Sequence, residues 1–123
     1  MGPLERKALL DEVASLVLTG QWRLGEAVRF LRAVVLGRSR PAFAKLVGVS
    51  PAALQQLEDW PDANPTLETL NRVLRPFGGA VGLVFPRMVP RPPPTAESET
   101  RHAALEAALR GTRRKKKSGP AGL

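Results

Sequence analysis

Residues 39–58 read SRPAFAKLVGVSPAALQQLE and contain two short helical patterns separated by a glycine. Ser39 and Ser50 are suited to cap the two helices, and each is followed within two residues by a proline, which the first helical turn tolerates. Gly48 ends the first pattern and permits a tight turn. A helix, a glycine turn and a second helix at this spacing predict a helix-turn-helix.

The second helix of this pair is expected to pack with one face and expose the other. Leu54 and Leu57 are the inward anchors, and Ala44 is small where the two helices must cross. The exposed face consists of Ser50, Pro51, Ala52, Gln55 and Gln56, and its chemistry suits the reading of DNA bases. Glutamine can form two hydrogen bonds with adenine, small apolar groups can contact the thymine methyl, and a helix N-terminus suits a phosphate. The simpler interpretation of the two glutamines is that they are exposed, helix-favouring residues.

Helical periodicity extends on both sides of this segment. Apolar residues at helical spacing predict helices over residues 4–18, 24–36 and 67–78, the last capped by Thr66. Within residues 24–36, Arg29 and Arg32 are expected to point outward. The chain therefore predicts a mainly α fold with an N-terminal extra helix.

Directly after Gly79 the sequence no longer shows the periodicity of a helix. Residues 80–85, AVGLVF, are short and apolar and predict a strand, which must pair with an N-terminal segment or with a second protomer. The prolines that follow predict an extended linker, and residues 97–109 predict a helix that is marginal because its apolar face is thin. The expected organisation is an N-terminal helix over 1–22, a DNA-binding domain over 23–86, and a linker, weak helix and tail over 87–123.

The net charge of +8 is concentrated near the C-terminus. Ten Lys or Arg face eight Asp or Glu up to Pro86, so the globular part is nearly neutral. The run Arg113, Arg114, Lys115, Lys116 and Lys117 forms a basic tail that is expected to be flexible and disordered. Such a run suits a polyanion such as DNA, RNA or an acidic membrane surface, and a solvated tail that aids solubility is the equally plausible alternative.

Composition argues against an enzyme. The chain has no cysteine and one histidine, His102, which removes thiolate chemistry and leaves no histidine cluster, so neither metal nor cofactor is expected. Ser39 and Ser50 are interpreted as caps because no histidine or lysine lies in a plausible relay with them. Both tryptophans, Trp22 and Trp60, are interpreted as packing residues. The apolar runs are shorter than the roughly 20 residues of a membrane span, and no secretory signal opens the chain, so a cytoplasmic location is expected.

The pattern FAKLVGVSPAALQQLE, followed by NPTLETLNRVLRPFG at residues 64–78, resembles the Xre or Cro/C1-type helix-turn-helix family, and within it the HipB-like antitoxins. The resemblance covers roughly residues 24–85. It implies a compact, lambda-repressor-like five-helix domain, a homodimer that binds palindromic double-stranded DNA, and a C-terminal strand paired across the dimer. By analogy Arg40, next to the Ser39 cap, would contact the DNA backbone. The family commonly has Gln where Arg40 stands and a glycine turn where Asp59, Trp60 and Pro61 stand, so the base sequence read cannot be carried over.

The leading hypothesis from the sequence is a transcriptional repressor that acts as the antitoxin of a toxin–antitoxin pair and also holds a kinase-like toxin. The expectation that the protein binds a toxin depends on the resemblance. The proline linker and the weak helix add to it only in that they could become ordered on a partner. One alternative is a stand-alone Xre-type regulator, for which a phage origin is one option. A second is an adaptor that binds protein or RNA.

Overall fold

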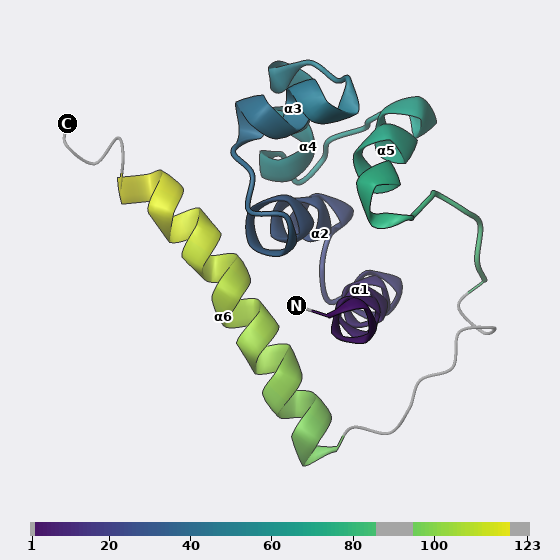
Figure 1. Ribbon diagram of the computed structural model, residues 1–123, viewed down its shortest axis with the longest axis vertical. Coiled ribbons are helices and arrows are strands. Elements are labelled where there is room, and N and C mark those ends of the chain that lie inside the picture. Colours follow the sequence, from purple (N-terminus) through teal and green to yellow (C-terminus); the bar gives the residue numbers. More distant parts are fainter. Residues whose placement is uncertain (1, 86–94, 119–123) are drawn as a thin grey trace.

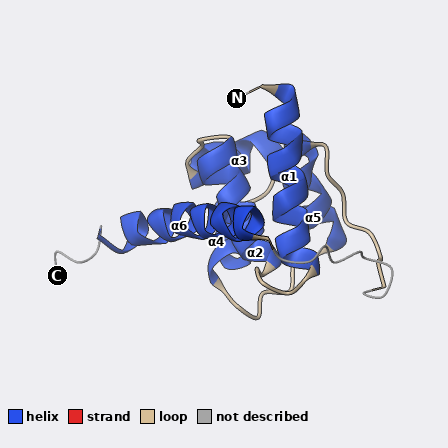
Figure 2. Ribbon diagram, turned by 90° about the horizontal axis from the view of Figure 1, so that it is seen from below, coloured by secondary structure: helices blue, strands red, loops and turns tan. Residues whose placement is uncertain are grey.

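The computed structural model describes residues 2–85 and 95–118, which form a helical bundle without a strand among them. The helices are α1 (Pro3–Leu18), α2 (Leu24–Phe30) with the π-helical turn η1 (Leu31–Val35), α3 (Arg40–Val47), α4 (Pro51–Asp59), α5 (Leu67–Leu74) with the 3-10 turn η2 (Arg75–Phe77), and α6 (Ala96–Ser118). Helices α1 to α5 gather into one body, and the long α6 lies along its α2 side (Figure 1). The C-terminal end of α6 projects beyond this body (Figure 2).

Helix α2 is the centre of the bundle and contacts α1, α4 and α6. Its approach to α4 is close because Gly25 carries no side chain. A Cβ atom built on Gly25 would lie 2.0 Å from the carbonyl oxygen of Leu57. The glycine therefore sets the distance between the two helices.

Two apolar clusters stabilise the bundle. The first core joins α2 to α3, α4 and α5 and consists of Val28, Phe43, Ala44, Leu54, Leu57, Leu70 and Val73. The second core joins α1 and α2 to α6 and consists of Val13, Leu16, Trp22, Ala27, Phe30 and Leu109. The predicted inward positions Ala44, Leu54 and Leu57 are confirmed. On α5, Leu70 and Val73 are buried, whereas Leu67 is largely exposed.

The helix predicted over residues 97–109 is present within the longer α6, and residues 113–117, which were expected to form a disordered tail, continue it in its last turns. Leu109 is 4% exposed in the second core, and Glu106 accepts a 2.8 Å hydrogen bond from Nε1 of Trp22. Glu12 on α1 forms an ion pair with Arg101, and its other carboxylate oxygen contacts Nε2 of His102. The thin apolar face suffices because polar contacts at its edges add to the one deeply buried leucine. The proline-rich residues 86–94 and the terminal residues 119–123 lie outside the described residues.

Residues 80–85 form no strand within the described chain, so pairing with an N-terminal segment, one of the two predicted arrangements, is not observed. The N–H of Val81 donates to the side-chain oxygen of Asn71 at 2.8 Å. The described segments contain no strand that could accept hydrogen bonds from the other backbone N–H groups of residues 80–85. Leu83 and Phe85 are exposed.

Within residues 2–85 and 95–118, no helix combines the length and apolar character that crossing a membrane requires.

Candidate nucleic-acid interface

Helices α3 and α4 are joined by a short turn whose ends are fixed by local hydrogen bonds. The hydroxyl oxygens of Ser39 and Ser50 accept from the N–H groups of Ala42 and Ala53 at 3.3 and 3.0 Å, as expected for N-caps. Gly48 has φ 75° and ψ 36°, a left-handed conformation that glycine adopts without strain. Ser39 thus fixes the start of α3, and Gly48 and Ser50 fix the turn that leads into α4.

Arg72 on α5 holds this turn from outside. Its Nη1 atom donates to the carbonyl oxygen of Gly48 at 2.6 Å, and its Nη2 atom pairs with Glu68 at 2.7 Å. A charged donor on the carbonyl of a turn restricts the turn more than solvent would. Sequence reasoning did not identify Arg72, whose only signal was the spacing of four residues from Glu68.

The two faces of α4 differ sharply. Leu54, Leu57 and Glu58 are buried against the rest of the bundle. The sequence-predicted residues that the structure leaves exposed on or beside the opposite face are Ser39, Ser50, Pro51, Ala52, Gln55 and Gln56. The structure therefore brings all of the predicted α4 contact residues to one accessible surface.

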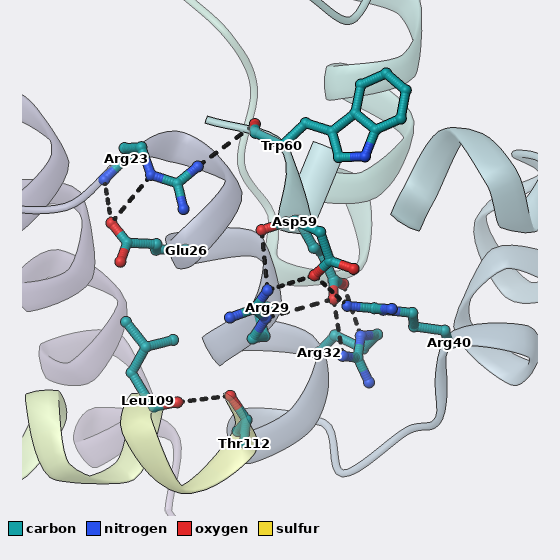
Figure 3. A network of polar contacts seen from close by, with 10 residues as sticks. Arg23, Glu26, Arg29, Arg32, Arg40, Asp59, Trp60, Leu109 and Thr112 are labelled. Carbon is teal, nitrogen blue, oxygen red and sulfur yellow. Dashed lines mark hydrogen bonds and ion pairs between the residues drawn. The ribbon is translucent and has the colours of Figure 1, made fainter. Parts of the chain in front are cut away.

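A buried cluster of charges lies beneath this surface and ties α2, α3 and α4 together (Figure 3). We call it the arginine–carboxylate cluster, and it consists of Arg29, Arg32, Arg40, Glu58 and Asp59. Glu58 is fully buried and accepts two hydrogen bonds from Arg32, at 2.7 and 2.8 Å, and one from Arg40, at 3.0 Å. Asp59 pairs with Arg29 and Arg40.

The expectation that Arg29 and Arg32 point outward is wrong, because both are buried. Arg29 donates to the backbone oxygen of Glu58 at 3.0 Å, and Arg32 donates to that of Arg38 at 2.8 Å. Burial of a guanidinium is tolerated only where carboxylates and carbonyls replace its water. The partners of Arg29 come from α4, some 30 positions further along the chain.

Arg40 occupies a bracing position. Its side chain is 19% exposed and bridges Glu58 and Asp59, so it fixes the start of α3 to the end of α4 (Figure 3). Its guanidinium is therefore engaged before any phosphate arrives. Arg38 and Lys45, which the sequence reasoning did not single out, are exposed cations near the two ends of α3.

The two tryptophans lie in different environments. Trp22 is buried with its ring 5.4 Å from that of Phe30, which confirms its interpretation as a packing residue. Trp60 is 52% exposed, so the same interpretation is wrong for its ring. The backbone of Trp60 is tied down instead: its N–H donates to the oxygen of Gln56 at 3.0 Å, and its oxygen accepts from the N–H of Ala63 at 3.2 Å. Arg23 donates to the same oxygen at 3.5 Å (Figure 3).

The basic residues from Arg113 to Lys117 lie in the last turns of α6, and their side chains fall outside what the structure describes. Among the described residues, no three His, Asp or Glu side chains gather where they could hold a metal ion.

Comparisons with models of protein families, with curated proteins and with solved structures found no match for this chain.

Proposed function

We propose that this protein is a sequence-specific DNA-binding transcriptional regulator in which α3 and α4 act as a helix-turn-helix and α4 reads bases in the major groove. The observation that carries the proposal is the surface of α4, where Pro51, Ala52, Gln55 and Gln56 are exposed while Leu54 and Leu57 anchor the helix from behind. A reading helix needs this combination, because base discrimination depends on side chains held at a fixed distance from the groove.

The distribution of charge around α4 also supports DNA binding by its exposed face. The two acidic residues of α4, Glu58 and Asp59, are paired with arginines inside the arginine–carboxylate cluster and do not face an approaching phosphate as free charges. The exposed face keeps only neutral residues, and Arg38 and Lys45 are exposed near the ends of α3. Phosphate contacts of this kind position a protein on DNA without carrying sequence information.

The proposal includes a homodimer on a palindromic operator in the cytoplasm, and the sequence resemblance to Xre-type regulators supports it. The exposure of Leu83 (85%) and Phe85 (59%) also supports a second copy, because an apolar segment without a strand partner can pair across a two-fold axis.

The HipB-like motif at residues 64–78 supports an antitoxin role in which the regulator also binds a kinase-like toxin. Co-purification from cells that express the neighbouring gene with an affinity tag tests it. Recovery of this protein in a stable complex would support the antitoxin role, whereas absence of a complex would favour a stand-alone regulator.

Gln56→Ala is expected to weaken binding to the specific site by about 1–3 kcal/mol and to leave binding to random duplex nearly unchanged, because only base readout is lost. The site is first selected from a pool of random duplexes with the full chain, and both affinities are then measured by fluorescence anisotropy.

The matched control is Gln21→Ala, which removes an exposed glutamine side chain between α1 and α2 that donates a hydrogen bond to the hydroxyl of Thr19. It should leave both affinities as they are. Equal losses by Gln56→Ala on specific and random DNA would show that Gln56 does not read bases.

A further inference from the structure

A cavity of about 500 Å³ lies between α1, α2, the end of α5 with η2, and the segment that follows η2. Its lining consists entirely of Ala, Val, Leu, Phe and Gly residues, among them Leu10, Ala14 and Val17 of α1. A volume of this size falls within the usual range of small-molecule sites. The interface proposed for DNA does not use it.

The wall opposite α1 is held in place by hydrogen bonds, although it has no regular secondary structure. The N–H of Val81 donates to Oδ1 of Asn71 at 2.8 Å, and the N–H of Gly79 donates to the carbonyl of Leu74 at 3.0 Å. Leu74 and Val81 both line the cavity. These two hydrogen bonds hold Gly79 and Val81 against α5.

A positive charge stands at the edge of this apolar space. The guanidinium carbon of Arg6 lies 6.0 Å from the ring centroid of Phe77, which lines the cavity, and Arg6 precedes the lining residue Leu10 by one helical turn. No carboxylate within the described residues forms an ion pair with Arg6. A half-buried guanidinium beside an aromatic ring retains its capacity for an anion.

We propose that this cavity binds an amphipathic carboxylate of the fatty-acid class, with its hydrocarbon tail among the apolar side chains and its carboxylate at Arg6. The tail needs no hydrogen-bonding partner, which suits a lining without polar side chains. A peptide segment in the same place would bring backbone N–H and C=O groups that this lining could not satisfy. The charge of Arg6 selects an acid over a neutral lipid of the same length.

The test is a calorimetric titration of the full chain with decanoate below its micelle concentration and, separately, with decan-1-ol, in the absence of DNA. Decanoate is expected to bind at least about tenfold more tightly than the alcohol, because both share the tail and only the acid engages Arg6. Methyl NMR signals of Leu10, Val17, Leu74 and Val81 should shift on binding, which places the tail in the cavity.

Four variants sharpen the result. Arg6→Ala should weaken decanoate about tenfold while leaving decan-1-ol unchanged, and Arg6→Lys should recover most of the loss because the charge is restored. Ala14→Phe adds a ring from an exposed position of α1 that lines the cavity, and it should abolish binding of both compounds. The matched control is Lys7→Ala. The ammonium of Lys7 is exposed and pairs with Asp11 at 3.1 Å, so its removal should not affect binding of either compound.

Failure of decanoate to bind would overturn the proposal. Binding that Arg6→Ala and Ala14→Phe leave unchanged would place the acid elsewhere and also overturn it. If decanoate does not bind and Ala14→Phe alters only self-association in sedimentation experiments, the cavity is a contact between copies of the chain and the proposal is wrong. None of these outcomes depends on whether α4 reads DNA.

Discussion

Glu58→Gln is expected to destabilise the fold by about 3–5 kcal/mol, the usual cost of leaving buried charges without their partner. Glu58 is fully buried and is contacted by Arg29, Arg32 and Arg40, so the neutral amide would leave these guanidiniums with only Asp59 as a carboxylate. One nitrogen of Arg29 is already buried without a hydrogen-bond partner, which leaves little capacity to absorb the change. Urea unfolding followed by circular dichroism gives the free energy of unfolding.

The matched control is Glu97→Gln on α6, which makes the same chemical change at an exposed ion pair with Arg101. Exposed pairs contribute at most about 1 kcal/mol, so this variant should unfold close to the parent midpoint. Similar small losses in both variants would show that the arginine–carboxylate cluster does not hold α2, α3 and α4 together.

Gly25→Ala is expected to destabilise the fold by at least about 3 kcal/mol, the upper part of the range for overpacked cores. The added Cβ would lie 2.0 Å from the carbonyl oxygen and 3.1 Å from the carbonyl carbon of Leu57. These are backbone atoms, so α2 and α4 must move apart and disturb the first core on both sides of the contact. Thermal unfolding and the urea midpoint both report the loss.

Gly111→Ala is the control for this substitution, because a Cβ at Gly111 meets no other atom within 4 Å. Gly111 lies inside α6, where alanine should stabilise the helix by about 1 kcal/mol relative to glycine. The two changes should therefore have opposite signs. A Gly25→Ala protein as stable as its parent would mean that α2 and α4 do not cross at this distance.

Local signals in the sequence predicted much of the helical fold. The caps at Ser39, Ser50 and Thr66 hold the hydrogen bonds expected of them, and Gly48 and Gly78 have the left-handed backbone that ends a helix. These features depend on residues three or four positions apart, so a sequence shows them directly.

The contacts that the sequence did not predict join distant segments. Arg29 and Arg32 have the spacing of an outward face, and nothing local shows that Glu58 and Asp59 will neutralise them. Leu109 is one leucine on an alanine-rich helix, and its burial depends on the surface that α1 and α2 offer. The strand predicted over residues 80–85 is not formed within the described chain, because a strand requires a strand partner and none is present there.

In the candidate site, too, some features could be predicted from local sequence and others could not. Exposure of Gln55 and Gln56 follows from the helical period of α4, which the sequence displays. The engagement of Arg40 with Glu58 and Asp59 and the grip of Arg72 on Gly48 depend on how α3, α4 and α5 meet. A bracing arginine and a phosphate-contacting arginine have the same sequence signature.

The most direct test of the DNA-binding proposal is a competition titration of the protein against a duplex from its own promoter and a scrambled duplex at moderate salt. Two forms are compared, the full chain and a chain that ends at Thr112, which removes the basic run but keeps Leu109 in the second core. We predict that both forms prefer the promoter and that the shortened form shows a weaker salt dependence. Equal affinity of both forms for the two duplexes, or loss of all binding in the shortened form, would contradict base reading by α4.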